Sequence, residues 1–249
     1  MLDRTAPTVD LNGLIESHAG LEGRELVSSI IKAAPGKVAL LSSFGAESAV
    51  LLHMVSEIEP ALPVLFLDTE KLFPETLAYV DELTQALGLT DVRHVRPFAE
   101  DLAEQDPVGN LHLYDKDLCC HYRKTVPMRA AQVEFDVLIS GRKRYHGATR
   151  TSLDFISLQD GKIKVEPLAA YSALDLRAYM QTHHLPSHPL ALQGYRSIGC
   201  VPCTVAGGSD EDPRAGRWSG TDKTECGIHF SANGKVIRTE VRQAAGALT

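Results

Sequence analysis

Short apolar runs alternate with helical patterns between residues 22 and 140. Apolar residues follow one another in three stretches, a fourth short stretch begins and ends with valine, and apolar residues recur every three or four positions in the segments between them. The predicted strands are 37–43, 63–68, 92–95 and 136–140, and the predicted helices are 22–34, 46–57, 73–87 and 120–134. Strands and helices in this alternation pair in parallel through right-handed crossovers, so the sequence predicts an α/β fold with a doubly wound, mostly parallel sheet.

The pattern changes on both sides of this region. Residues 1–22 show weak periodicity, which predicts an N-terminal arm or a short helix. After residue 151, two short apolar segments joined by Asp160-Gly161 predict a hairpin, and Ser172 with Asp175 predicts a capped helix to about residue 183. Beyond Cys203 the periodicity is lost among glycines and acidic residues. We therefore expect an arm (1–22), one α/β domain (23–203) and a mobile, flexible C-terminal segment (204–249).

Composition and charge exclude several classes of protein. The net charge of −7 disfavours broad binding of nucleic acid, whose phosphates favour an excess of lysine and arginine. No stretch approaches the roughly 20 apolar residues that a membrane span needs, and the first residues lack a signal-peptide pattern, so we expect a cytoplasmic protein without a membrane partner. Basic residues gather in three short groups, which suit either a small anion or a solvated surface: Arg123 with Lys124, 142–144 with Arg150, and Arg214 with Arg217.

Three segments follow predicted strands and are candidates for a nucleotide site. Ser42 to Ser48 opens a helix, so its amides and hydroxyls can bind an anion at the helix N-terminus, although the same residues also form ordinary turns and caps. Leu67 ends the second strand and Gly141 the fourth. Because ligands of open parallel sheets bind at the carboxyl ends of the strands, the three segments together indicate a nucleotide site. The first segment is neither a Walker loop nor the glycine pattern of dinucleotide binders.

Four of the five cysteines form two tight pairs. Cys119 and Cys120 are adjacent, and Cys200 and Cys203 are one helical turn apart. Four converging thiolates predict a metal site, with buried structural thiols as the alternative. Adjacent cysteines fit a single zinc ion poorly, whereas a cubic four-iron cluster offers a separate iron to each sulfur; the sequence favours iron and leaves zinc as the alternative. Lys124 follows Cys120 by four positions, so on a helix it shares that face.

The fifth cysteine, Cys226, lies in a glycine-rich and charged segment. A lone cysteine is ordinarily a small buried hydrophobic residue. Here the cations Arg214 and Arg217 precede it, and nearby cations favour the thiolate, which is the nucleophilic form. His229 can be either a further anion ligand or a solvated residue.

Taken together, these motifs resemble the assimilatory adenylyl-sulfate reductases, which belong to the larger group of reductases for phosphorylated and unphosphorylated adenylyl sulfate. The resemblance runs from about residue 36 to 230. It depends on the order of six motifs: Ser42 to Ser48, Cys119 to Lys124, Gly141 to Arg144, Cys200 to Cys203, Arg214 to Trp218, and Glu225 to His229.

The resemblance implies an adenine-nucleotide α-hydrolase-like fold and the reduction of adenosine 5′-phosphosulfate to sulfite and AMP. It implies that Cys226 attacks the sulfur and that thioredoxin releases sulfite from the resulting S-sulfocysteine. It also implies a [4Fe-4S] cluster on Cys119, Cys120, Cys200 and Cys203. The implied substrate contacts are Ser42, Ser43, Gly45 and Ser48 on the phosphate side, Leu67 and Gly141 near the adenosine, and Lys124, Arg150, Arg214, Arg217 and His229 around the phosphosulfate.

Two departures and three alternatives accompany this interpretation. Family members often have glycine where this chain has Glu70, and the spacing from Arg217 to Cys226 is short. The alternatives are a reductase of 3′-phosphoadenylyl sulfate, a sulfurtransferase of the same fold, and an iron–sulfur sensor without catalysis. Such a sensor has no need of Cys226. The sequence is compatible with a homo-oligomer and does not determine the oligomeric state.

Overall fold

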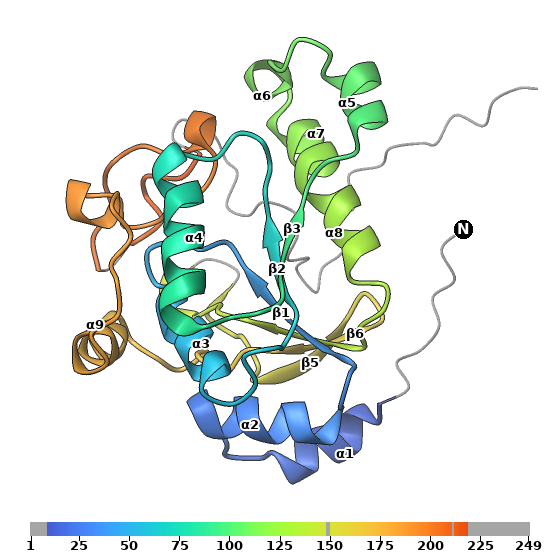
Figure 1. The fold of residues 1–249 in the computed structure, drawn as a ribbon, viewed down its shortest axis with the longest axis vertical. Coiled ribbons are helices and arrows are strands. Elements are labelled where there is room, and N and C mark those ends of the chain that lie inside the picture. The colour runs from blue at the N-terminus through green and yellow to red at the C-terminus, as the bar shows by residue number, and fades with distance from the viewer. Residues whose placement is uncertain (1–8, 148–149, 211, 219–249) are drawn as a thin grey trace, which may run out of the picture.

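The computed structural model describes residues 9–147, 150–210 and 212–218. Its centre is a six-stranded sheet in the order β3-β2-β1-β4-β6-β5 (Figure 1). The strands are β1 (Val38–Ser42), β2 (Val64–Leu67), β3 (Val92–Val95), β4 (Val137–Ser140), β5 (Ile156–Gln159) and β6 (Lys162–Val165). All neighbouring strands are parallel except β5, which forms the predicted hairpin with β6. The predicted mostly parallel α/β sheet is thus confirmed.

The strand order reverses between β1 and β4. From β1 the chain first extends the sheet through β2 to β3, and then returns to place β4 on the other side of β1. Segments that leave the carboxyl ends of β1 and β4 diverge at such a switch point and leave a crevice between them. The turn that begins at Ser42 and the segment that begins at Gly141 are the two that flank this crevice.

Helices cover both faces of the sheet. They are α1 (Leu11–Ser17), α2 (Gly23–Ala33), α3 (Ser48–Ser56), α4 (Pro74–Leu87), α5 (Ala99–Gln105), α6 (Leu111–Tyr114), α7 (Lys116–Cys120), α8 (Val126–Ala131) and α9 (Ala173–Thr182). Side chains of α2, α3, α4 and α9 pack on one face with Val38, Leu40, Val64 and Phe66. Met128 of α8 packs on the other face with Ala39, Leu41 and Leu65. The alternation of inward residues along each strand therefore supplies both apolar layers.

Helix ends follow the local chemistry of the sequence. Gly88 ends α4 in the left-handed conformation at φ 63°, which glycine adopts without a steric penalty. Ser172 and Asp175 form the predicted capping box of α9. At the N-terminal side, residues 11–17 form the short helix that weak periodicity allowed, and the buried side chain of Leu14 joins the main core.

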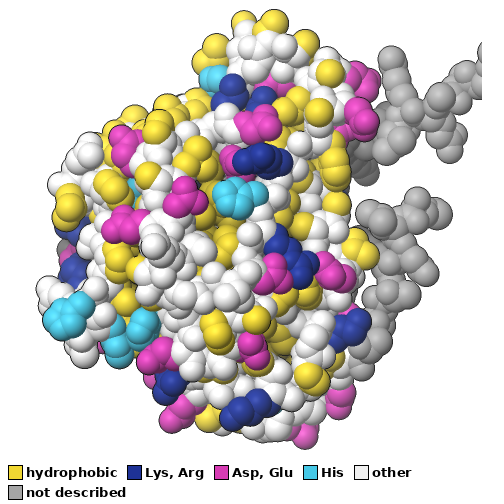
Figure 2. Space-filling model, in the orientation of Figure 1, with side chains coloured by type: hydrophobic (Ala, Val, Ile, Leu, Met, Phe, Trp, Pro, Cys, Tyr) yellow, Lys and Arg dark blue, Asp and Glu magenta, His cyan; other side chains and the backbone are white. Residues whose placement is uncertain are grey.

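Residues 99–114 form α5 and α6, which the sequence pattern did not reveal. Neither helix contains a buried residue, so neither carries an amphipathic signal. The arrows of β1 and β2 point toward the half of the molecule that holds these helices (Figure 1). In this region apolar side chains lie among charged ones on the surface (Figure 2). Val108, Leu113 and Tyr114 are exposed. No helix in the described part of the chain is both long enough and apolar enough to cross a membrane.

Candidate functional site

A cavity of about 220 Å³ lies at the carboxyl ends of the strands, and we call it the strand-end cavity. Its walls come from the turn after β1, the end of β2, the segment after β4, and residues 196–200 and 214–218. All ten substrate-contact residues that were predicted within the described ranges line it: Ser42, Ser43, Gly45, Ser48, Leu67, Lys124, Gly141, Arg150, Arg214 and Arg217. Residues far apart in the sequence thus form one site at the switch point of the sheet.

The turn after β1 holds an unusual backbone conformation. Phe44 has φ 47°, in the left-handed region that non-glycine residues rarely adopt. Its ring is fully buried and packs edge-on against Phe66 at 5.2 Å between centroids. The amide of Phe44 donates to Ser42 Oγ at 3.2 Å. The predicted turn at Phe44-Gly45 is therefore present, and core packing of the Phe44 ring offsets the local strain that directs the chain into α3.

The basic segment after β4 is more buried than a solvated patch. The Arg142 guanidinium donates to Glu166 through Nε at 2.8 Å and Nη2 at 2.5 Å, and Ser140 Oγ donates to the same carboxylate at 2.6 Å. Arg144 lies over the ring of Phe155. The Arg142–Glu166 pair is buried, so removing either partner would leave an uncompensated charge in the interior. This pair fixes the start of the segment that lines the cavity.

Glu47 also lines the strand-end cavity, and sequence reasoning missed it. Its carboxylate accepts from Lys143 Nζ at 2.6 Å, from the Tyr145 hydroxyl, and from His146 Nε2 at 3.1 Å. An acidic residue in the turn after β1 carries no recognisable signal when its partners lie about a hundred positions away in the sequence. The pattern of the chain alone could not have identified it.

A second and smaller cavity lies next to the first, and we call it the cysteine cavity. Its lining includes the four paired cysteines, Cys119, Cys120, Cys200 and Cys203. All four side chains are buried, and the residue types around them are mostly cationic: Lys71, Lys116, Arg123 and Lys124, with His112 and Pro202. The structure therefore brings the two predicted cysteine pairs together from separate segments.

Arg123 connects the segments that carry the two pairs. It donates from Nη2 to Asp106 Oδ2 at 2.7 Å and from Nη1 to the Thr69 carbonyl at 3.0 Å. Thr69 Oγ1 lies 3.2 Å from Cys200 Sγ. Cys120 is followed by a π-helical turn, His121–Thr125, which alters the register of the side chains after the pair. Buried contacts thus hold the end of β2 and both cysteine segments against each other.

The chemistry of the four thiols suits a soft, electron-rich metal centre. Burial and the neighbouring Cys120 raise the pKa of Cys119 to about 11, so the thiol is protonated until a metal replaces its proton. No group of three His, Cys, Asp or Glu side chains converges closely enough to hold a single ion within residues 9–147, 150–210 and 212–218. A cubic cluster does not need that convergence, because each sulfur binds its own iron. The surrounding cations would compensate an anionic cluster, so the residues fit such a group.

The two cavities share part of their lining. Lys124 and Cys200 line both the strand-end cavity and the cysteine cavity. Lys124 is also buried, and a charge in such surroundings interacts more strongly than one in water. A group held in one cavity is therefore electrostatically coupled to a group held in the other.

Residues 204–218 fold back onto the second cysteine pair. Thr204 pairs with Arg217, and the amide of Trp218 donates to the Cys203 carbonyl at 3.1 Å. The guanidinium of Arg217 lies 4.4 Å from the centre of the Trp218 ring. A Cβ on Gly199 would lie 2.3 Å from Arg217 Nη2, so only glycine allows this approach. These contacts fix Arg217 at the edge of the strand-end cavity.

Cys226 and His229 lie outside the described residues. Their predicted roles, and the division of the chain into an arm, a domain and a mobile C-terminal segment, remain predictions.

Known proteins share both the sequence and the fold. Residues 37–206 match the family model of the phosphoadenosine phosphosulfate reductase domain. An adenosine 5′-phosphosulfate reductase of Mesorhizobium japonicum is 47% identical over 78% of this chain and 77% of its own length. One of Halalkalibacterium halodurans is 32% identical over 89% of this chain and 97% of its own length.

Among solved structures, the fold resembles that of phosphoadenylyl-sulfate reductase from Candida auris in its phosphate complex. The TM-score is 0.68 at 23% identity, over 81% of this chain and all of the other. This similarity supports the fold, and the family match supports the chemistry. The chain belongs to the phosphoadenosine phosphosulfate reductase family and is an oxidoreductase that acts on a sulfur group.

Proposed function

We propose that this protein reduces adenosine 5′-phosphosulfate to sulfite and AMP in assimilatory sulfate reduction. The observation that carries the proposal is the pairing of the two cavities: one is lined by ten residues predicted to contact the nucleotide, and the other by four buried cysteines. The relatives named adenosine 5′-phosphosulfate reductase support the choice of nucleotide. The thiols require a reducing compartment, so we assign the reaction to the cytoplasm.

In the strand-end cavity the residues divide by chemistry. Ser42, Ser43, Gly45 and Ser48 come from the turn that opens α3, so their hydroxyls and amides can bind the phosphate side. Leu67 and Gly141 lie at the ends of β2 and β4, where an adenosine can pack. The remaining contacts are cationic and suit the phosphosulfate: Lys124, Arg150, Arg214 and Arg217, with His229 from outside the described residues.

The proposed reaction begins with the Cys226 thiolate. Its sulfur attacks the sulfur of the sulfuryl group, a sulfur–sulfur bond forms, and the bond from that sulfur to the bridging oxygen breaks. AMP leaves with the electron pair and the enzyme retains an S-sulfocysteine. Cations around the phosphosulfate stabilise the charge that develops on the leaving phosphate.

Thioredoxin completes the cycle in this proposal. One thioredoxin thiolate attacks Sγ of Cys226 and expels sulfite, which leaves a mixed disulfide. The second thioredoxin thiol then releases the Cys226 thiolate, so thioredoxin is oxidised to its disulfide and supplies the two electrons that reduce the sulfur.

We propose that Cys119, Cys120, Cys200 and Cys203 hold a [4Fe-4S] cluster. When bound, the cluster would supply a fixed negative charge beside the substrate site. Lys124 lines both cavities, so its ammonium would lie between that charge and the sulfate end of the substrate and interact with both. No redox step at the cluster is required by the reaction.

Steady-state turnover tests the proposal directly. The anaerobically purified protein, supplied with thioredoxin and adenosine 5′-phosphosulfate, is expected to form sulfite and AMP in equal amounts. Cys226→Ser is expected to form neither. Turnover of 3′-phosphoadenylyl sulfate alone would support the rival reductase instead. A brown, iron-containing protein that turns over neither nucleotide would support the sensor interpretation and contradict the proposal.

A further inference from the structure

Glu47 joins the turn after β1 to the segment after β4. Three donors of that segment converge on its carboxylate: Lys143 Nζ at 2.6 Å, the Tyr145 hydroxyl, and His146 Nε2 at 3.1 Å. The side chain of Lys143 is only 5% exposed and that of Glu47 is 24% exposed. Glu47, Lys143 and His146 all line the strand-end cavity, so this network forms part of the wall that a nucleotide meets.

The charges of this network cancel within the wall. Burial acts to raise the pKa of Glu47, but the Lys143 charge and the hydrogen bonds from Lys143 and His146 outweigh it and hold the pKa well below its usual range. Burial lowers the pKa of His146, so its ring is neutral at neutral pH. One carboxylate and one ammonium therefore remain, and the Lys143 charge already has its counterion.

The network also orients a predicted substrate contact. Since the neutral ring of His146 donates from Nε2 to Glu47, its Nδ1 carries a lone pair. Arg150 Nη1 lies 3.3 Å from that atom, within hydrogen-bond distance. The carboxylate of Glu47 thus fixes the tautomer of His146, and His146 in turn positions Arg150.

We propose that Glu47 is a specificity-determining residue of the strand-end cavity, which compensates Lys143 and thereby disfavours a nucleotide that carries an additional ribose phosphate. A second phosphate adds up to two negative charges and needs an uncompensated cation to replace its water. In this cavity the cation of Lys143 is neutralised, and the Glu47 carboxylate repels the added anion. The inference rests on the proposed function, because it names the substrate class that the same cavity selects.

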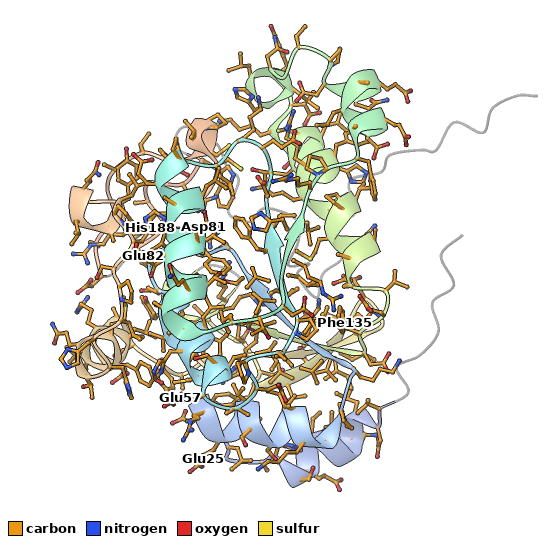
Figure 3. All side chains as sticks on the ribbon, in the orientation of Figure 1. Glu25, Glu57, Asp81, Glu82, Phe135 and His188 are labelled. Atoms are coloured by element: carbon orange, nitrogen blue, oxygen red, sulfur yellow. The ribbon has the colours of Figure 1, made fainter. Side chains whose placement is uncertain are left out.

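The decisive quantity is the ratio of kcat/KM for 3′-phosphoadenylyl sulfate to kcat/KM for adenosine 5′-phosphosulfate. Glu47→Gln keeps the shape of the side chain and removes its charge, so this ratio is expected to rise about tenfold. The matched control is Glu57→Gln, the same substitution in the same segment. Glu57 caps the far end of α3, pairs with Arg24, and lies away from the carboxyl ends of the strands (Figure 3). The ratio of this control is expected to equal that of the wild type.

A double variant distinguishes charge compensation from a merely structural role. If Glu47 acts by neutralising Lys143, then Glu47→Gln combined with Lys143→Gln is expected to return the ratio to within about twofold of the Lys143→Gln single variant. A Glu47→Gln ratio that stays within about twofold of the wild type contradicts the proposal, even if both nucleotides react more slowly. Should Glu47→Gln fail to fold, Glu47→Asp, which retracts the charge by one methylene, is expected to raise the ratio by less, and an unchanged ratio contradicts the proposal equally.

A binding measurement separates this inference from the reductase proposal. Calorimetric titration with AMP and with adenosine 3′,5′-bisphosphate needs no sulfur chemistry. The wild type is expected to prefer AMP, and Glu47→Gln is expected to lose most of that preference. If turnover is absent but the preference shifts in this way, the proposed reaction fails and the role of Glu47 stands. If turnover occurs and the preference does not shift, the role of Glu47 fails alone.

Discussion

The strand-end cavity and the cysteine cavity are neighbours, but they differ in size, in exposure and in how their charges are paired. The strand-end cavity gathers residues from many segments around an open crevice, and several of its charges are already paired: Arg142 with Glu166 and Lys143 with Glu47. The cysteine cavity is small and buried, and its four thiols face a predominantly cationic surrounding. The first is suited to a ligand that enters and leaves, and the second to a group that stays. Lys124 and Cys200 line both cavities, so they can contact both the ligand that enters and the group that stays.

The largest loss of turnover is expected when a cysteine of the cysteine cavity is replaced. Cys203→Ser removes a ligand, so it should reduce bound iron and lower turnover by more than the roughly hundredfold loss that removal of a supporting contact can cause. Iron and labile sulfide analysis, read beside sulfite formation, measures both. The control is Val201→Ala in the same short turn, where the side chain is half-exposed. Full iron content in Cys203→Ser would show that the cavity does not hold the cluster.

Lys124→Ala tests the shared wall between the cavities. We expect turnover to fall about a hundredfold while iron content stays unchanged, because a charge at the reacting group is lost and no metal ligand is removed. Lys116→Ala is the matched control, since Lys116 lines the cysteine cavity alone. Equal turnover in the wild type and Lys124→Ala, with iron intact, would mean that the two cavities act independently.

His188 gives a pH-dependent prediction, because it contacts Thr76, which lines the strand-end cavity. His188 is fully buried beside α4, accepts from the Leu190 amide, and contacts Thr76 Oγ1 at 3.1 Å (Figure 3). Burial lowers its pKa from 6.5 to about 4. The unfolded chain therefore binds the extra proton first as the pH falls. Stability is complete above pH 6.5 and should decrease between pH 6.5 and about 4, by up to about 3 kcal/mol.

Chemical denaturation across this pH range measures the effect. His188→Gln retains a donor and an acceptor in the side-chain amide but does not titrate. In this variant, the decrease in the free energy of unfolding that His188 causes below pH 6.5 should disappear. Identical pH profiles for the two proteins would mean that the pKa of His188 is the same in the folded and the unfolded chain, against the lowering caused by burial.

The smallest expected effect is a change in the free energy of unfolding when Glu70, in the turn after β2, is replaced. Glu70 has φ 57°, in the left-handed region that non-glycine residues rarely adopt. Its carboxylate lies 3.6 Å from Arg123 Nη1 and is half-exposed, so the ion pair contributes little. Glu70→Gly should therefore raise the free energy of unfolding by about 1 kcal/mol through relief of backbone strain. Glu70→Ala keeps the Cβ and should give no increase; an equal gain in both variants would exclude backbone strain as the cause.

The sequence predicted β1, β2 and β4 well because these strands are almost fully buried and read as continuous apolar runs. It predicted β3, which contains Arg93 and His94, from the alternation of strands and helices. The segments that follow β1, β2 and β4 could be placed at the cavity because the carboxyl ends of parallel strands lie at one edge of the sheet. The cations Lys124, Arg150, Arg214 and Arg217 were expected only from the family resemblance. The sequence did not predict α5 and α6, which bury no side chain. Nor did it reveal Glu47 or the pairing of Arg142 with Glu166, since both depend on contacts between distant segments.

The central claim is that sulfur is transferred to one thiol beside a nucleotide in the strand-end cavity. Intact-protein mass spectrometry after a single addition of adenosine 5′-phosphosulfate, with thioredoxin withheld, tests it most directly. We predict one sulfonate adduct per chain, located on Cys226 by peptide mapping and absent from Cys226→Ser. An unmodified protein that nevertheless releases AMP and sulfite, or an adduct that persists in Cys226→Ser, would contradict the account.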